Sequence, residues 1–278
     1  METALAELTV TPAYFIDLIW SYYRDHKRTF PWRHVSDPYL VVVSEIMLQQ
    51  TQTVRVMQQY DPFIEQFPTF KALANAPLAH VLSAWQGLGY NRRAIALHKI
   101  AQKVVLEYEG TLPAEPAILQ TFPHIGPNTA GSISAFAFNR PTIFIETNIR
   151  SVFIHFFFAD SVTIPDKDIL ALVEQTVDAH NPREWYYALM DYGVMLKKKI
   201  PNPNRKSAHY AMQSKFEGSH RQIRGMILKL LTQHEKLPQS YLATFIEREP
   251  ESITRAIHEL HKEGFITIDA DGIITISS

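Results

Sequence analysis

Helical patterns cover almost the whole chain, and one short stretch joins two of them through an unusually tight turn. Residues 123–130, Pro-His-Ile-Gly-Pro-Asn-Thr-Ala, lie between helical patterns at 114–122 and 128–138. Two prolines and Gly126 shape the turn, and the second helix opens with small residues that permit a close approach. The stretch predicts a helix–hairpin–helix whose exposed backbone N–H groups suit a phosphate oxygen. A plain helical hairpin with a Gly-Pro turn is the alternative interpretation.

Proline and capping residues mark the other helix starts. Thr11-Pro12 and Asp37-Pro38 each place a capping side chain before a proline at the first helical position. Glycines at 87, 89 and 110 are typical of helix ends. The body of the chain is therefore expected to be helical, and the patterns that indicate it lie at residues 40–50, 53–67, 77–90, 91–110, 166–180 and 183–199.

Composition narrows the class of protein. The chain has 278 residues, of which 46% are hydrophobic and none is cysteine. This excludes disulfides, thiol nucleophiles and cysteine-held iron–sulfur clusters. We expect no membrane segment and no signal peptide, and hence a cytoplasmic protein. The net charge of −1 gives no sign of a nucleic-acid partner, so any such surface must be local.

The last 60 or so residues show a different pattern of predicted secondary structure. Residues 218–278 predict three helices and then a β-hairpin around Asp271-Gly272, an arrangement that resembles a winged helix. The helix at 249–265 would be its recognition helix, but it is not strongly basic, with Glu249, Glu251 and Glu259 against Arg255 and Lys262, so contact with DNA and a structural role both remain open. We interpret His258 and His261 as a solvated or packing pair rather than a metal site, because no carboxylate-rich ligand set accompanies them.

Two acids stand in apolar surroundings. Glu45 lies within Val-Val-Val-Ser-Glu-Ile-Met-Leu, and Glu146 follows Thr-Ile-Phe-Ile. A buried carboxyl has a raised pKa, which suits a general acid, and a second carboxylate can stabilise positive charge. This is the logic of glycosidic bond cleavage. The alternatives are a partly exposed helix face for Glu45 and a helix cap for Glu146.

Several motifs together resemble the helix–hairpin–helix DNA glycosylases, and among them the adenine (MutY-like) branch. They are FPWRHVSDPYLVVVSEIMLQQTQ, LANAPLAHVLSAWQGLGYNRRAIALHKIA, PHIGPNTAGSISAFAF and IETNIRSV, over about residues 10–200. The resemblance implies a mainly α, two-lobed glycosylase fold followed by a C-terminal winged-helix-like α+β domain. Residues 1–30 and 140–217 would form one lobe, and residues 31–139, with the hairpin at 114–138, a six-helix lobe.

The resemblance also implies roles for individual residues. Glu45 would protonate the departing adenine, Glu146 would stabilise the sugar cation, and Asn148 would lie beside it. Arg33 would lie near a base that is flipped out of the duplex. The residues that would contact DNA or the lesion are Leu48, Gln50, Thr51, Tyr90, His124, Gly126, Asn128, Thr129 and Lys198.

The chain departs from the family pattern in ways that shape the expected chemistry. Glu146 replaces the family aspartate, and His124 replaces the first glycine of the hairpin. Asn128 stands where bifunctional relatives carry a lysine, so there is no amine there for a Schiff base and no strand cleavage is expected. The family's cluster cysteines are absent, and basic residues at 197–199, 205 and 206 could supply phosphate contacts instead. A solvated basic loop is the alternative.

The sequence thus predicts a monomeric, monofunctional mismatch glycosylase that acts on double-stranded DNA and removes adenine opposite 8-oxoguanine or guanine. We expect no cofactor and no site for a catalytic metal, and a monovalent cation at the hairpin 123–126 is left open. The alternatives are a glycosylase for uracil or thymine opposite guanine, and a lesion-binding protein without catalysis.

Overall fold

A computed structural model describes residues 10–212 and 215–277, and the chain divides into two compact units. The first unit comprises residues 1–36, 114–120 and 125–212, and the second comprises residues 37–113, 121–124 and 213–278. The expected lobes placed the whole hairpin with residues 31–139. By this division both helices of the hairpin, residues 116–119 and 127–138, belong to the first unit, and only residues 121–124 between them belong to the second.

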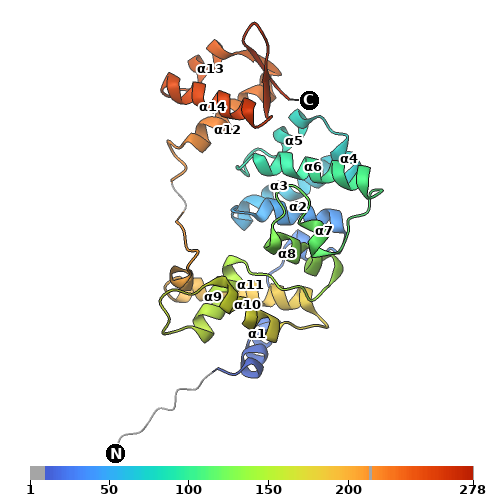
Figure 1. Cartoon of the computed structure of the whole chain (residues 1–278), viewed down its shortest axis with the longest axis vertical. Helices are drawn as coiled ribbons and strands as arrows, with labels where there is room; N and C mark the ends of the chain where they lie inside the picture. The colour runs from blue at the N-terminus through green and yellow to red at the C-terminus, as the bar shows by residue number, and fades with distance from the viewer. Residues whose placement is uncertain (1–9, 213–214, 278) are drawn as a thin grey trace, which may run out of the picture. The chain divides into compact units, whose positions relative to one another are not determined.

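Within the residues described, the first unit consists of helices and one isolated parallel bridge between Ile164 and Ser207 (Figure 1). Its elements are α1 (Pro12–His26), η1 (Pro31–Arg33), α7 (Pro116–Leu119), α8 (Pro127–Phe138), α9 (Thr147–Phe157), α10 (Asp166–Thr176), α11 (Pro182–Lys199) and η2 (Pro203–Lys206). Helix α11 packs against α9, α1 and α8. Aromatic side chains fill the space between them: the ring of Phe15 lies 5.1 Å from that of Phe153 and 6.1 Å from that of Trp185.

The small residues of α8 explain its position. A Cβ built on Gly131 would lie 2.8 Å from the Cβ of Phe144, so only glycine permits this approach. The hydroxyl of Thr142 donates to the carbonyl of Gly131 over 2.7 Å and fixes the segment that leads to α9. The close packing expected at the start of this helix is confirmed.

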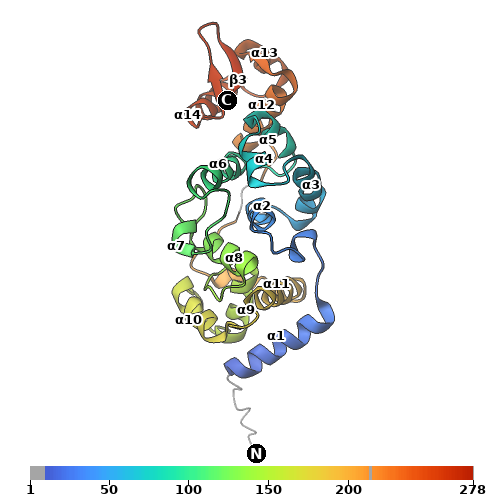
Figure 2. The same ribbon diagram turned by 90° about the vertical axis from the view of Figure 1, so that its right-hand side faces the viewer.

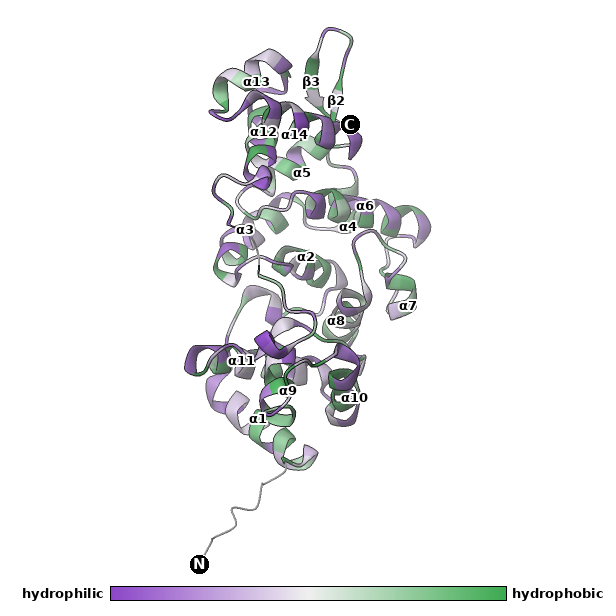
Figure 3. Cartoon of the chain, turned by 60° about the vertical axis from the view of Figure 1, so that its left-hand side comes forward, coloured by the Kyte–Doolittle hydropathy of each residue, from purple (hydrophilic) through white to green (hydrophobic). Residues whose placement is uncertain are grey.

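The second unit combines helices with a small sheet (Figure 2). Its elements are α2 (Pro38–Leu48), α3 (Thr53–Gln66), α4 (Phe70–Ala74), α5 (Leu78–Ala84), α6 (Arg92–Glu107), α12 (His220–His234), β1 (Lys236–Pro238), α13 (Gln239–Phe245), α14 (Pro250–Lys262), β2 (Ile266–Ile268) and β3 (Ile273–Ile276). Helix α2 is the most apolar and lies in the core, whereas α14 has one hydrophobic and one hydrophilic face (Figure 3).

The C-terminal segment, residues 215–277, has the expected three helices and hairpin. Strand β3 pairs with β2 in the antiparallel register Thr267 to Thr275, and Gly272 adopts the positive φ of 75° that the turn requires. Strand β1 also pairs with β3, so the sheet order is β1-β3-β2. The sequence did not reveal β1, because a three-residue strand that ends in a proline, Lys236–Pro238, is too short to show an alternating pattern.

Candidate active site

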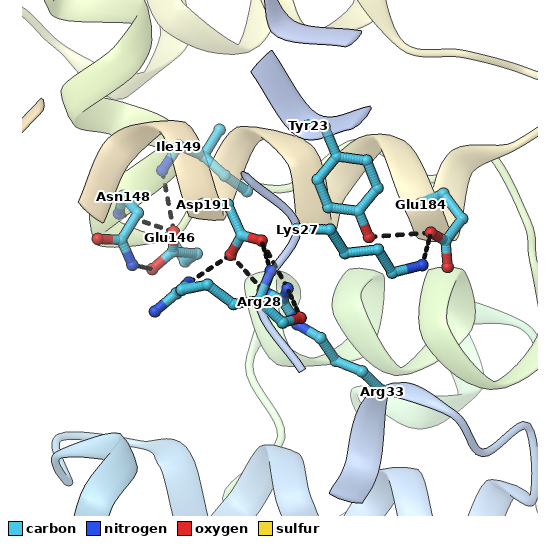
Figure 4. A network of polar contacts seen from close by, with 9 residues as sticks. All are labelled: Tyr23, Lys27, Arg28, Arg33, Glu146, Asn148, Ile149, Glu184 and Asp191. Atoms are coloured by element: carbon cyan, nitrogen blue, oxygen red, sulfur yellow. Dashed lines mark hydrogen bonds and ion pairs between the residues drawn. The ribbon is translucent and has the colours of Figure 1, made fainter. Parts of the chain in front are cut away.

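Glu146 is the N-cap of α9. Its Oε1 accepts hydrogen bonds from the backbone N–H groups of Asn148 (2.7 Å) and Ile149 (2.9 Å), and its Oε2 accepts one from the side-chain Nδ2 of Asn148 (3.1 Å; Figure 4). The capping interpretation of this acid is confirmed. The same bonds fix the carboxylate at the positive end of a helix dipole, where negative charge is favoured.

The surroundings of Glu146 act on its pKa in opposite directions. Burial raises the pKa, and the N–H of Ile149, the charge of Lys197 and the two bonds from Asn148 lower it; the net direction is upward. Lys197 belongs to α11, one turn beyond Gly193. A Cβ on Gly193 would lie 2.5 Å from the backbone oxygen of Asn148, so this glycine lets α11 approach the start of α9 closely.

Asp191, also on α11, forms the centre of a second polar cluster in the same unit. Arg28 donates its backbone N–H (2.9 Å) and its Nε (2.6 Å), and Arg33 donates Nη1 and Nη2 in a bidentate pair at 2.8 Å each. The Arg33 guanidinium also lies 4.5 Å from the centre of the Tyr187 ring, and its side chain is only 4% exposed. Such a bidentate pair between a buried arginine and a carboxylate is geometrically specific.

Arg33 directs its donors at Asp191 and at the carbonyl of Arg28. Its expected position near a flipped base stays a prediction. Arg28 is the more exposed of the two arginines. Burial and the charge of Arg28 lower the pKa of Lys197, whereas the charge of Glu146 raises it. Sequence reasoning missed Arg28 and Asp191. The signal was an acid in the apolar run Trp-Tyr-Tyr-Ala-Leu-Met-Asp, where an unpaired charge would be costly.

Glu45 lies in the second unit, on α2. Its immediate neighbours Ser44 and Ile46 are buried, and Glu45 itself is partly exposed. Its side chain has both an apolar surrounding and access to solvent, which is what a proton donor to a bound base needs. Because Glu45 and Glu146 belong to different units, their convergence around a nucleoside stays a prediction.

Two loops of the second unit carry the residues expected to enter DNA. Gln50 is exposed after the end of α2 with φ 53°, and Tyr90 has φ 49° after Gly87 and Gly89. Left-handed backbone is uncommon for residues other than glycine and often marks functional loops. Leu48, the last residue of α2, is half-buried at the base of the first loop.

A single buried arginine joins these two loops. Arg93 Nη1 donates to the carbonyls of Ile46 (2.9 Å), Met47 (2.8 Å) and Gln49 (2.5 Å). Its Nη2 donates to the hydroxyl of Thr51 (2.9 Å) and to the carbonyl of Gly89 (2.9 Å). Burial lowers its pKa to about 10, which still leaves it charged at neutral pH.

Sequence reasoning did not single out Arg93. The available signal was a base at the start of the apolar run Ala-Ile-Ala-Leu, on the face of α6 that is buried. A charge at such a position requires several hydrogen-bond acceptors, and the two loops provide them as backbone carbonyls.

The hairpin adopts the predicted turn before α8. His124 has φ 65°, a left-handed conformation in which a glycine would be less strained. Gly126 has an ordinary φ of −86°, and a Cβ added to it would meet nothing within 4 Å. The structure itself thus gives no steric reason for glycine at 126. Asn128 accepts the backbone N–H of Ile145 over 3.0 Å and braces the segment before Glu146, and Thr129 is half-buried.

Comparisons with known proteins agree on the family. Residues 43–177 match the model of the HhH-GPD superfamily of base excision DNA repair proteins, and residues 223–269 match the MarR family. The chain is 34% identical over 193 residues to an adenine DNA glycosylase of Buchnera aphidicola, of which it spans 54%. It is 30% identical over 311 aligned positions to an adenine DNA glycosylase of Mycobacterium tuberculosis, with 98% of this chain and 97% of that protein covered.

The chain belongs to the adenine DNA glycosylase family. A solved structure of a thermostable thymine-DNA glycosylase shares the fold, with a TM-score of 0.61 and 23% identity over 69% of this chain and 90% of that one. At that identity the likeness supports the fold alone. The mainly α, helix–hairpin–helix architecture and the winged-helix-like C-terminal segment are confirmed.

The basic region begins at the end of α11, and the segment that follows is hydrogen-bonded to α9. Helix α11 continues through Lys198, which is exposed, to Lys199. Beyond it, the buried Asn204 donates to the carbonyl of Thr147 (2.9 Å) and to the hydroxyl of Ser151, both on α9. The backbone beyond α11 is thus held to α9, whereas the side chains of Lys198, Lys199 and Arg205 are exposed.

Among residues 10–212 and 215–277, the structure contains neither a helix long and apolar enough to cross a membrane nor a cluster of three or more potential metal ligands from His, Cys, Asp and Glu. His258 and His261 are both exposed, and the Nδ1 of His261 is hydrogen-bonded to the carbonyl of Ile266 over 3.0 Å. The monovalent cation at the hairpin remains a prediction.

Proposed function

We propose that this protein is a monofunctional adenine DNA glycosylase that removes adenine mispaired with 8-oxoguanine or guanine. Membership of the adenine DNA glycosylase family over nearly the full length supports the reaction class. The observation that carries the chemistry is the carboxylate of Glu146, held by Asn148 and Ile149 at the start of α9. A fixed carboxylate of this kind stabilises a sugar cation without having to reorganise during the reaction.

The reaction follows from the two acids. Glu45 donates a proton to N7 of the extruded adenine, and the C1′–N9 bond breaks with its electron pair leaving on the base. The sugar becomes oxocarbenium-like, and the negative charge of Glu146 stabilises it. Water then adds to C1′ and gives its proton to Glu45, leaving an abasic site.

The remaining residues would hold the duplex. The N–H groups at the start of α8, beside the open Gly126, suit a phosphate, and exposed Lys198 adds positive charge. Gln50 and Tyr90, which lie on left-handed backbone in two loops, would replace stacking when a nucleotide leaves the duplex. Because Arg93 binds backbone carbonyls of both loops, a movement of one loop would displace the other.

A panel of duplexes tests the proposal. Wild-type protein is incubated with A·8-oxoguanine, A·G, U·G, T·G and fully paired DNA, and abasic sites are revealed by hot alkali. We expect release of adenine from the first two duplexes only, and Glu45→Gln should bind A·8-oxoguanine DNA without turnover. Cutting of U·G or T·G in preference to the adenine mispairs would assign a different substrate. Binding without turnover by the wild type would identify a lesion-binding protein.

A further inference from the structure

The C-terminal segment is tied to both sides of the turn that carries Tyr90. Before the turn, Gln86 Nε2 donates to the hydroxyl of Thr232 over 2.6 Å. After it, Arg92 Nε donates to Glu263 Oε2 over 2.7 Å. Arg224 on α12 binds the same carboxylate, with Nη2 at 2.6 Å from Oε2. These contacts lie within the second unit, where α12 packs on α5.

Arg221 contacts Tyr90 itself. Its Nη1 donates to the Tyr90 hydroxyl, and its guanidinium carbon lies 5.3 Å from the centre of the ring. Arg93, the residue that joins the two loops, has its guanidinium carbon 5.5 Å from the same ring. Two guanidinium groups from different segments thus engage one half-buried aromatic side chain, each through a favourable cation–π contact.

Two carboxylates, that of Glu259 on α14 and that of Glu263 at its C-terminal cap, are paired with basic side chains of the second unit. Glu259 accepts from His220 (2.8 Å) and Arg255 (3.1 Å), and Glu263 binds Arg92 and Arg224. The hydrogen bond from Arg92 is the largest influence on the pKa of Glu263, which is lowered to about 2. Glu259 and Glu263 therefore attach this helix to α12 and to α6, whereas Glu249 and Glu251 are exposed. This favours an internal role for the C-terminal segment.

We infer that Arg221 is a positioning residue for Tyr90, through which the winged-helix-like segment controls how well the enzyme distinguishes the base opposite adenine. The inference rests on the proposed function. An aromatic side chain that enters a duplex acts only in a narrow range of orientations, and the left-handed backbone of Tyr90 leaves its ring in need of support. Arg221 contacts the ring at its hydroxyl end. Arg93 also contacts the ring and binds the carbonyl of Gly89, the residue before Tyr90.

Matched variants on α12 test the inference. Arg221→Ala removes the contact to Tyr90, whereas Arg224→Ala removes an attachment of the same helix that does not touch Tyr90. Single-turnover rates and dissociation constants are measured on A·8-oxoguanine, A·G and fully paired duplexes. We expect Arg221→Ala to reduce the preference for A·8-oxoguanine over fully paired DNA about tenfold, mainly in binding, and Arg221→Lys to restore part of it. Arg224→Ala should keep the wild-type preference.

A double-mutant comparison covers the case in which a variant is poorly folded. Tyr90→Phe keeps the ring and loses only the hydroxyl, so Arg221→Ala should have a smaller effect in that background than in the wild type. Equal loss of preference in Arg221→Ala and Arg224→Ala, or an undiminished effect beside Tyr90→Phe, would overturn the positioning role. Thermal unfolding of each variant shows whether folding differs.

The two proposals fail in distinguishable ways. If wild-type protein releases adenine from no duplex, the proposed function is wrong. The binding preference for A·8-oxoguanine over fully paired DNA then still reports on Arg221, because it needs no turnover; a wild type without any such preference rejects the inference as well. If the wild type is active and Arg221→Ala retains the full preference, only the inference is wrong.

Discussion

The guanidinium of Arg93, on α6, donates a 2.9 Å hydrogen bond to the hydroxyl of Thr51, in the loop that follows α2. The same group binds the carbonyls that end α2 and the carbonyl of Gly89. One buried cation therefore fixes both loops that are expected to enter the duplex. Its desolvation is offset by hydrogen bonds to backbone oxygens rather than by a carboxylate.

Arg93→Ala should be strongly destabilising. It leaves several buried carbonyls without donors, at a cost of about 1–3 kcal/mol for each one that water cannot reach. We expect a large fall in the melting temperature, and in any protein that still folds, weak binding to mispaired DNA. Arg92→Ala is the control, because that side chain is 65% exposed and exposed ion pairs contribute about 0–1 kcal/mol. Similar melting temperatures for the two variants would contradict the role assigned to Arg93.

Glu146→Gln should abolish turnover and preserve binding. The variant keeps the size of the side chain and an oxygen that can cap α9, but it loses the charge that stabilises the sugar cation. Glu146→Asp keeps the charge and shortens the side chain, and a displacement of about 1 Å costs roughly 10²-fold in rate. Single-turnover rates on A·8-oxoguanine DNA, with the dissociation constant measured alongside, separate the two effects. Full activity of Glu146→Gln would remove this residue from the mechanism.

The acid limb of the pH–rate profile should report on Glu146. The carboxylate must be ionised to act, and burial raises its pKa. As the pH is lowered, Glu146 therefore becomes protonated, and activity is lost, at a higher pH than would be expected for an exposed glutamate. The charge of Lys197 lowers that pKa; hence Lys197→Met should move the acid limb to still higher pH. Lys199→Met, on the exposed end of α11, is the control and should leave the limb in place. Coincident limbs for all three proteins would show that Lys197 does not act on Glu146.

Alanine substitutions at two glycines of the hairpin region should affect different properties, DNA affinity at Gly126 and stability at Gly131. Gly126→Ala places a methyl group in open space at an ordinary φ, so stability is expected to change by less than about 1 kcal/mol while affinity for duplex DNA falls. Gly131→Ala forces a Cβ within 2.8 Å of Phe144 and should lower the melting temperature. Chemical denaturation and DNA titrations measure both. Unchanged DNA affinity of Gly126→Ala would show that the backbone at 126 does not contact the phosphates.

The product should be an intact strand with an abasic site. Asn128 has no amine, and its side-chain oxygen accepts the N–H of Ile145. We expect no strand breaks without alkali, and no covalent complex after borohydride reduction. A borohydride-trapped complex that disappears in Lys197→Met would instead assign a Schiff base to the half-buried lysine near Glu146.

Local patterns were enough to predict most of the helices and the two acids. Prolines, caps and glycines mark where helices such as α1, α2 and α8 begin and end, because these residues act on the backbone through nearest neighbours. The capping role of Glu146 was visible for the same reason: its partners Asn148 and Ile149 lie two and three residues away. The winged-helix-like order of three helices and a hairpin could also be predicted, apart from the short strand β1.

The contacts that organise the candidate site were not visible in this way. Asp191 lies 158 residues from Arg33, and Arg93 lies 42 residues from Thr51. A buried ion finds its partners wherever packing brings acceptors together, and the identity of the partner depends on the whole fold rather than on sequence spacing. The amino-acid order alone therefore specified the elements, the two candidate carboxylates and the family. Only tertiary packing determined that Arg33 binds a carboxylate, that Arg93 joins two loops, and that Arg221 holds Tyr90.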